Sequence, residues 1–62
     1  MRYTELNEGE EIIYTVDELP DLYGLYSGTV AAVYDDHIIV DVPKISDHLW
    51  IDEDNEDLIS RR

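Results

Sequence analysis

The chain has no cysteine, so neither a disulfide nor a thiolate zinc site can stabilise its fold. It has no apolar run near the ~20 residues that a membrane-spanning helix needs, and its polar, acidic N-terminus does not resemble a secretory signal. Basic residues are scarce: four Lys and Arg accompany sixteen Asp and Glu, which gives a net charge of −12. Such a surface repels nucleic acid and anionic membranes. We therefore expect a cytoplasmic protein that contacts neither directly.

What the chain does contain is enough apolar sequence for one small domain. Its 62 residues are 44% hydrophobic, too apolar for a disordered acidic tail. A core of this size is marginal, and we expect a net stability of roughly a few kcal/mol. Composition therefore predicts a single folded unit, either a monomer or a weak dimer.

The stretch from Gly28 to Val42 predicts a β-hairpin, because it holds the densest run of β-branched residues in the chain. Asp35–Asp36 forms the predicted turn, since Asp tolerates the left-handed backbone that hairpin turns often need. Val30 and Val33 are three residues apart, so a flat strand cannot point both inward. A bulge near Ala31–Ala32 would place both on one face. The predicted core consists of Val30, Val33, Ile38, Val40, Val42, Leu49 and Ile51.

The segments around the hairpin are less regular. Residues 1–9 are a weakly patterned lead-in, and a first strand is predicted over residues 10–16. Residues 17–27 are expected to form a long connection, because Pro20 excludes a central strand there. This connection is apolar enough to predict an ordered loop that folds over an open end of the domain. The two remaining strands are predicted at residues 48–52 and 58–60.

Five short strands, a long loop after the first and a polar turn before the last resemble the SH3-like small β-barrel. The resemblance runs from Gly9 to Ile59, and its sharpest piece, Leu25–Val33, is similar to the Gly-x-Val-x-x-Val opening of many bacterial and ribosomal small barrels. It implies an all-β, five-stranded SH3-like barrel over residues 10–62, with room for a single-turn helix before the last strand. Such barrels serve many unrelated functions, so the resemblance implies a fold and no activity. An oligonucleotide-binding barrel is the alternative fold.

Trp50 is the one tryptophan, and period-two alternation places it opposite Leu49 and Ile51. If those two residues belong to the core, the indole points outward near Tyr34 and Ile39, where it could anchor a partner. The alternative is that Trp50 only covers the wall of the domain. The candidate aromatic binding residues are Tyr23, Tyr26, Tyr34 and Trp50.

The run from Asp52 to Asp57 begins with carboxylates at the one-three-five spacing of a calcium-binding EF-hand loop. Position six is Asp57 instead of Gly, and position twelve would lie beyond Arg62, so an EF-hand is excluded. A solvated acidic turn is the simpler interpretation, and it could bind a basic partner. Its candidate binding residues are Asp52, Glu53, Asp54, Glu56 and Asp57.

His37 and His48 are the two imidazoles, and each follows an Asp in the sequence. Neighbouring negative charge favours the protonated ring, so both are candidate pH sensors of modest effect at most, and an ordinary surface histidine is the favoured interpretation of each. Neither has the further ligands of a metal site, and the sequence predicts no metal and no cofactor. No serine carries a nucleophile motif, and a small closed barrel leaves little room for a catalytic pocket, so an enzyme is not expected.

The charge favours a non-enzymatic binding protein that docks a basic protein partner, which could itself be a nucleic-acid-binding protein. A sharper version is an inhibitor, such as a phage or mobile element might encode, that mimics the phosphate charge of nucleic acid. A small accessory or structural subunit that binds a larger assembly through its aromatic residues is the alternative. Adaptation to a salty cytoplasm ranks third.

Overall fold

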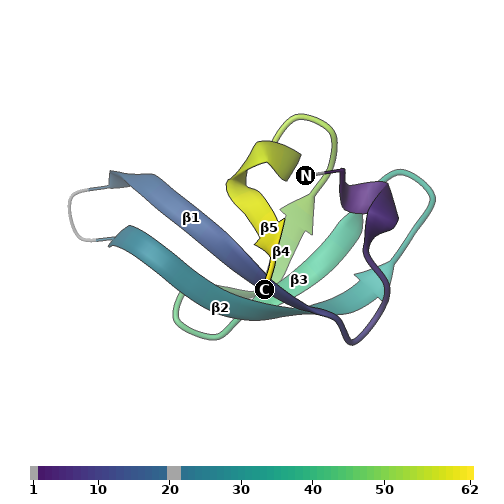
Figure 1. The fold of residues 1–62 in the computed structure, drawn as a ribbon, viewed down its shortest axis with the longest axis horizontal. Coiled ribbons are helices and arrows are strands. Elements are labelled where there is room, and N and C mark those ends of the chain that lie inside the picture. The colour runs from purple at the N-terminus through teal and green to yellow at the C-terminus, as the bar shows by residue number, and fades with distance from the viewer. Residues whose placement is uncertain (1, 20–21) are drawn as a thin grey trace.

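Five antiparallel strands form one sheet in the computed structural model of the protein (Figure 1). The structure describes residues 2–19 and 22–62, and it does not describe the side chains of residues 17–23. The elements, in chain order, are η1 (Tyr3–Glu5), β1 (Glu11–Leu19), β2 (Leu22–Val33), β3 (Ile38–Val42), β4 (Ser46–Ile51), η2 (Glu56–Leu58) and β5 (Ile59–Arg61). Both η elements are 3-10 turns, and the strand order is β4-β3-β2-β1-β5. Within the described ranges, no helix is long and apolar enough to cross a membrane.

The predicted hairpin is present as β2 and β3, closed by a backbone hydrogen bond of 2.9 Å that the Tyr34 N–H donates to the His37 carbonyl. Val30 lies opposite Val40, but Ala32 lies opposite Ile39, so one extra residue bulges from β2 between the two pairs. This confirms the bulge that the valine spacing predicts. The prediction of a left-handed backbone in the turn is wrong, because no described residue other than glycine has a positive φ.

The hairpin supplies half of the core cluster of buried residues, namely Val30, Ile38, Val40 and Val42. Leu49 is partly buried and packs against this core, as its alternation with Trp50 predicts. Val33 was expected in the core, but 48% of it is exposed. The bulge does turn Val33 toward the same face, opposite the buried Ile38. Val33 is exposed because it is the last residue of β2, where the sheet ends. The confirmed core residues are Val30, Ile38, Val40, Val42 and Ile51.

Three further core residues come from the two ends of the chain and from β1. Leu6, within the segment expected as a lead-in, is buried together with Ile12 and Ile59. The N-terminal segment is held in place by a hydrogen bond of 2.8 Å from the Tyr3 N–H to a carboxylate oxygen of Glu56, in η2. Arg61 also donates a hydrogen bond of 2.8 Å to the Glu5 carbonyl. The two termini therefore close over the same side of the core.

The long connection predicted over residues 17–27 is wrong, because β1 and β2 extend through most of it as a two-stranded ribbon. Thr15 pairs with Leu25 and Val16 with Gly24 before the register shifts. Gly24 has a φ of 128°, a backbone conformation that L side chains rarely adopt, and it lies where the pairing becomes irregular. Pro20 lies outside the described residues. In Figure 1 this ribbon runs out beyond the other strands.

The helical turn expected before the last strand is present as η2. β5 pairs with β1 over three residues, from Ile12 to Tyr14, and β4 forms the opposite edge of the sheet. No pairing joins β4 to β5 in the part of the chain that the structure describes. The all-β class and the five strands are therefore confirmed, while closure into an SH3-like barrel stays a prediction.

Candidate functional site

Three aromatic rings stack at the end of the sheet where β2 turns into β3. The His37 ring lies 3.5 Å from the Trp50 ring and 4.6 Å from the Tyr34 ring, with interplanar angles of 5° and 13°. Two rings parallel to one small imidazole cannot share a face of it without overlapping, so Tyr34 and Trp50 lie on opposite faces of His37. Only 12% of the His37 side chain is exposed. We call Tyr34, His37 and Trp50 the aromatic stack.

The register of the strands explains why these rings meet. Ile39 of β3 lies opposite Trp50 of β4 on one side and opposite Ala32 of β2 on the other. Directly opposite residues share a face of the sheet, so these three residues lie on the outer face, away from the core row of Ile38 and Val40. Only 7% of Ile39 is exposed, although it faces away from the core. Its apolar side chain lies next to the stack, opposite Trp50. The two outer rings of the stack stay half-exposed, Tyr34 at 55% and Trp50 at 51%.

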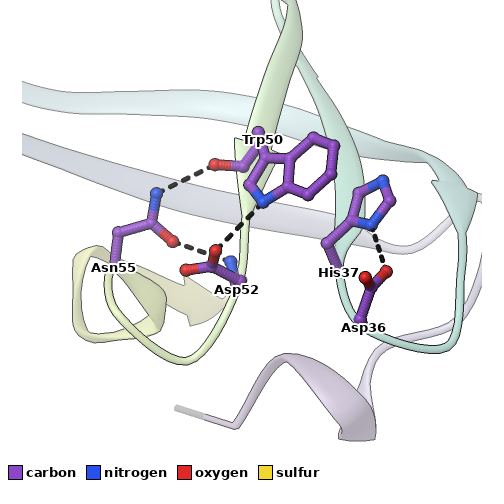
Figure 2. A network of polar contacts seen from close by, with 5 residues as sticks. All are labelled: Asp36, His37, Trp50, Asp52 and Asn55. Carbon is purple, nitrogen blue, oxygen red and sulfur yellow. Dashed lines mark hydrogen bonds and ion pairs between the residues drawn. The ribbon is translucent and has the colours of Figure 1, made fainter.

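A polar network fixes the position of Trp50 (Figure 2). The indole Nε1–H donates a hydrogen bond of 3.0 Å to Oδ2 of Asp52. The Asn55 side chain donates a bond of 2.8 Å to the Trp50 carbonyl and accepts one of 2.8 Å from the Asp52 N–H. The second carboxylate oxygen of Asp52 accepts from the Asp54 N–H at 2.9 Å. Asp52 and Asn55 thus tie the loop after β4 to the indole.

His37 has its own carboxylate partner. Its Nδ1 lies 2.7 Å from Oδ1 of Asp36, at the centre of the hairpin turn. This hydrogen bond lowers the pKa of Asp36 below its ordinary value of 3.8, because it stabilises the carboxylate form. The other ring nitrogen of His37 points away from Asp36 in Figure 2. The stack therefore has a carboxylate on either side, Asp36 beside the imidazole and Asp52 beside the indole.

Carboxylates that form no ion pair with a lysine or arginine in the described structure lie on the turn and loop next to the stack. In the described structure the two arginine ion pairs lie on the β1–β5 side, Arg61 with Glu10 at 3.4 Å and Arg62 with Glu11 at 3.9 Å. Near the stack, His37 is the one group that can carry a positive charge opposite a carboxylate. We call the carboxylates of the β2–β3 turn and of the loop after β4 the acidic rim: Asp35, Asp36, Asp52, Glu53 and Asp54.

The remaining candidate residues lie elsewhere. Glu56 and Asp57 belong to η2, where Glu56 accepts a hydrogen bond from the N-terminal segment. Tyr26 is partly buried and packs against the core, opposite Tyr14 in the β1–β2 ladder. It also lines a cavity of about 320 Å³ with Leu25 and Lys44, at the other end of β3 from the stack. Tyr26 therefore lies apart from the aromatic stack, and the Tyr23 side chain lies outside the described residues.

Two functional residues were missed as members of this site. The sequence marks His37 only as a candidate pH sensor, and its position between two aromatic rings follows from a cross-strand register that no local pattern reveals. Asn55 is the one amide side chain in the acidic run from Asp52 to Asp57. This difference from its neighbours was the feature of the sequence that could have indicated its structural role. Among the described residues, no group of three or more His, Cys, Asp or Glu is arranged to hold a metal ion. Asp52 is instead used as an acceptor within its own loop.

Comparisons with protein-family models, curated proteins and solved structures find no match to this chain. What can be inferred about function comes from the acidic rim and the aromatic stack. Together they make a local surface with an apolar centre and a negatively charged edge. Protein-binding surfaces commonly have this plan, in which a desolvated aromatic anchor is surrounded by polar groups.

Proposed function

We propose that this chain is a non-enzymatic binding protein that docks a basic protein partner on the acidic rim, with the aromatic stack as its anchor. The observation that carries the proposal is that exposed aromatic rings lie beside carboxylates that form no ion pair with a lysine or arginine in the described structure. Sequence reasoning treats acid-driven docking and an aromatic anchor as competing hypotheses. Their coincidence on one surface supports a single mode of binding that uses both.

The chemistry of the surface suits a Lys or Arg side chain. A cation placed over the exposed part of Trp50 would be attracted by the negative face of the indole, an effect of about 0.5–2 kcal/mol. Asp52, bound to the edge of the same indole, would add a carboxylate beside that cation. The net charge of −12 would steer a basic partner toward the protein from a distance and raise its association rate.

Mimicry of nucleic acid is the narrower form of this proposal. The longest dimension of the described structure is 33 Å, and duplex DNA of that length carries about 19 phosphates. The net charge is of the same order, which supports mimicry of charge. The exposed carboxylates, however, are spread over η1, β1, the β2–β3 turn, β4, the loop after β4 and η2. The distribution supports docking at the acidic rim more directly than it supports replacement of a whole duplex.

An accessory subunit that binds mainly through its aromatic residues is the alternative. The observation in its favour is the half-exposed Trp50, which a solvent-facing sheet does not require. Salt separates the two functions, because attraction between exposed charges is screened at high ionic strength and burial of an indole is not.

The experiment uses hexa-arginine peptide as a defined basic probe, alongside any protein captured from native lysate at low salt. The double variant Glu53→Gln/Asp54→Asn removes two exposed rim charges. The matched control, Glu8→Gln/Glu11→Gln, removes two charges outside the rim. We expect the rim variant to slow association several-fold more than the control, with a small effect on dissociation. Trp50→Ala should weaken binding of the peptide by about 0.5–2 kcal/mol.

Two results would contradict the proposal. Equal effects of the rim and control variants would show that total charge, and not this surface, attracts the probe. Binding that is the same at low and high salt, yet abolished by Trp50→Ala, would favour the accessory subunit instead.

A further inference from the structure

We propose that His37 makes this docking surface sensitive to pH, so that protonation of its imidazole weakens binding of a basic partner. The inference rests on the proposed function and concerns the regulation of the same surface. Histidine is the side chain whose charge ordinarily changes between pH 5 and 8. Here that side chain lies at the centre of the aromatic stack, next to the ring that would anchor the partner.

The geometry identifies where the additional proton goes. Nδ1 of His37 faces Oδ1 of Asp36 at 2.7 Å, so in the neutral ring Nδ1 carries the proton and donates it to the carboxylate. The additional proton therefore binds Nε2, which points away from Asp36 (Figure 2). Because the pKa of Asp36 is lowered, this carboxylate stays ionised throughout the near-neutral range. Protonation of the ring thus changes the charge of the surface by one full unit.

The groups around the imidazole determine the sign of the effect. From its own turn it faces the Tyr34 ring and Asp36, and from β4 the Trp50 ring, with Asp52 of the following loop at the edge of that ring. The described structure places no lysine or arginine ion pair among these groups. An imidazolium here offsets one rim carboxylate. It also lies 3.5 Å from the indole whose other face would accept the partner's cation, and two cations on one indole repel each other.

Binding of hexa-arginine peptide at low salt, measured at about pH 8 and about pH 6, tests this inference. Arginine stays protonated at both, so the peptide itself does not titrate. A unit charge about 6 Å from a partner's cation weakens binding by about threefold in water. We therefore expect wild type to lose about threefold more affinity on acidification than His37→Gln. His48→Gln, which removes the other imidazole, should behave like wild type. His37→Phe keeps an aromatic ring without a titrating nitrogen and serves if the Gln variant does not fold.

Trp50 fluorescence, followed in the same samples, separates the inference from the proposed function. The imidazole stacks on the one tryptophan, so emission should follow the protonation of His37 in wild type and lose this transition in His37→Gln. Peptide binding with the same pH response in all variants would overturn the inference and leave the docking surface intact. No peptide binding at either pH, with a normal fluorescence transition, would show an intact stack that docks no basic ligand, and both proposals would fall.

Discussion

Replacing Gly28 with alanine should destabilise the protein, although the same change in an open strand would help it. Gly28 has no positive φ, so its backbone would accept alanine, and Gly→Ala at such a position ordinarily gains about 0.4–1 kcal/mol. The space that the added methyl group would occupy, however, is already filled by neighbouring atoms. A Cβ at this position would lie 2.8 Å from Cγ2 of Val42, 2.9 Å from the Asp41 carbonyl oxygen and 3.3 Å from Cδ1 of Ile12.

Two of these three distances are shorter than real Cβ contacts, and one of them involves a backbone oxygen that cannot rotate away. Overpacking of this kind costs about 1–3 kcal/mol. For a domain of this size, each kcal/mol lowers the melting temperature by roughly 4–8 °C. We therefore expect Gly28→Ala to lower the melting temperature by about 4–24 °C, measured by circular dichroism.

A second variant identifies the contact responsible. Val42→Ala removes the methyl group that the new Cβ meets first, at the expense of a cavity in the core. If that methyl causes the loss, Gly28→Ala should cost less in the Val42→Ala background than alone. Equal losses would assign the clash to the Asp41 carbonyl. A Gly28→Ala protein as stable as wild type would refute the close approach of β2 to β3 on which this reasoning depends.

Three further outcomes can be checked by melting experiments. Asn55→Ala removes the bonds to the Trp50 carbonyl and the Asp52 N–H, and should cost about 1–2 kcal/mol while changing Trp50 emission; unchanged emission would contradict the role of Asn55 in holding the indole. Val40→Ala, at a fully buried position, should cost about 1–3 kcal/mol. The pKa of Asp36 is lowered below 3.8, so its carboxylate stabilises the fold above that pH, and this contribution is lost as pH falls through the lowered pKa. Asp36→Asn should therefore lose less stability than wild type on acidification below about pH 4.

The parts of the fold that the sequence predicts are those governed by short-range patterns. β-branched residues and alternation identify the β2–β3 hairpin, and the three-residue spacing of Val30 and Val33 identifies its bulge. The ribbon of β1 and β2 was missed because Pro20 was given too much weight. A proline disfavours a strand only in its immediate neighbourhood, and the two strands are present up to Leu19 and from Leu22 onward.

Short-range sequence patterns also predict part of the candidate site. Alternation along β4 places Trp50 outward and Ile51 inward, and both placements are correct. The contact of Trp50 with His37 depends instead on which residue of β3 lies opposite which residue of β4. That register results from packing of the whole sheet, including the bulge in β2, and a single strand does not encode it. For this reason the sequence marks both residues as candidates and does not bring them together.

The contacts that hold Trp50 in place help to decide whether this exposed side chain has a binding role or only a structural one. An exposed indole free to rotate would lose side-chain entropy on binding, at about 0.5–1.5 kcal/mol. Trp50 is held before any partner arrives, since His37 stacks on one face, Asp52 bonds its Nε1 and Asn55 bonds its carbonyl. None of these contacts buries the ring, half of which stays exposed. Contacts that fix a large aromatic side chain without covering it add little to a core, but they lower the entropic cost of docking. That combination favours a binding role for the stack over a purely structural one.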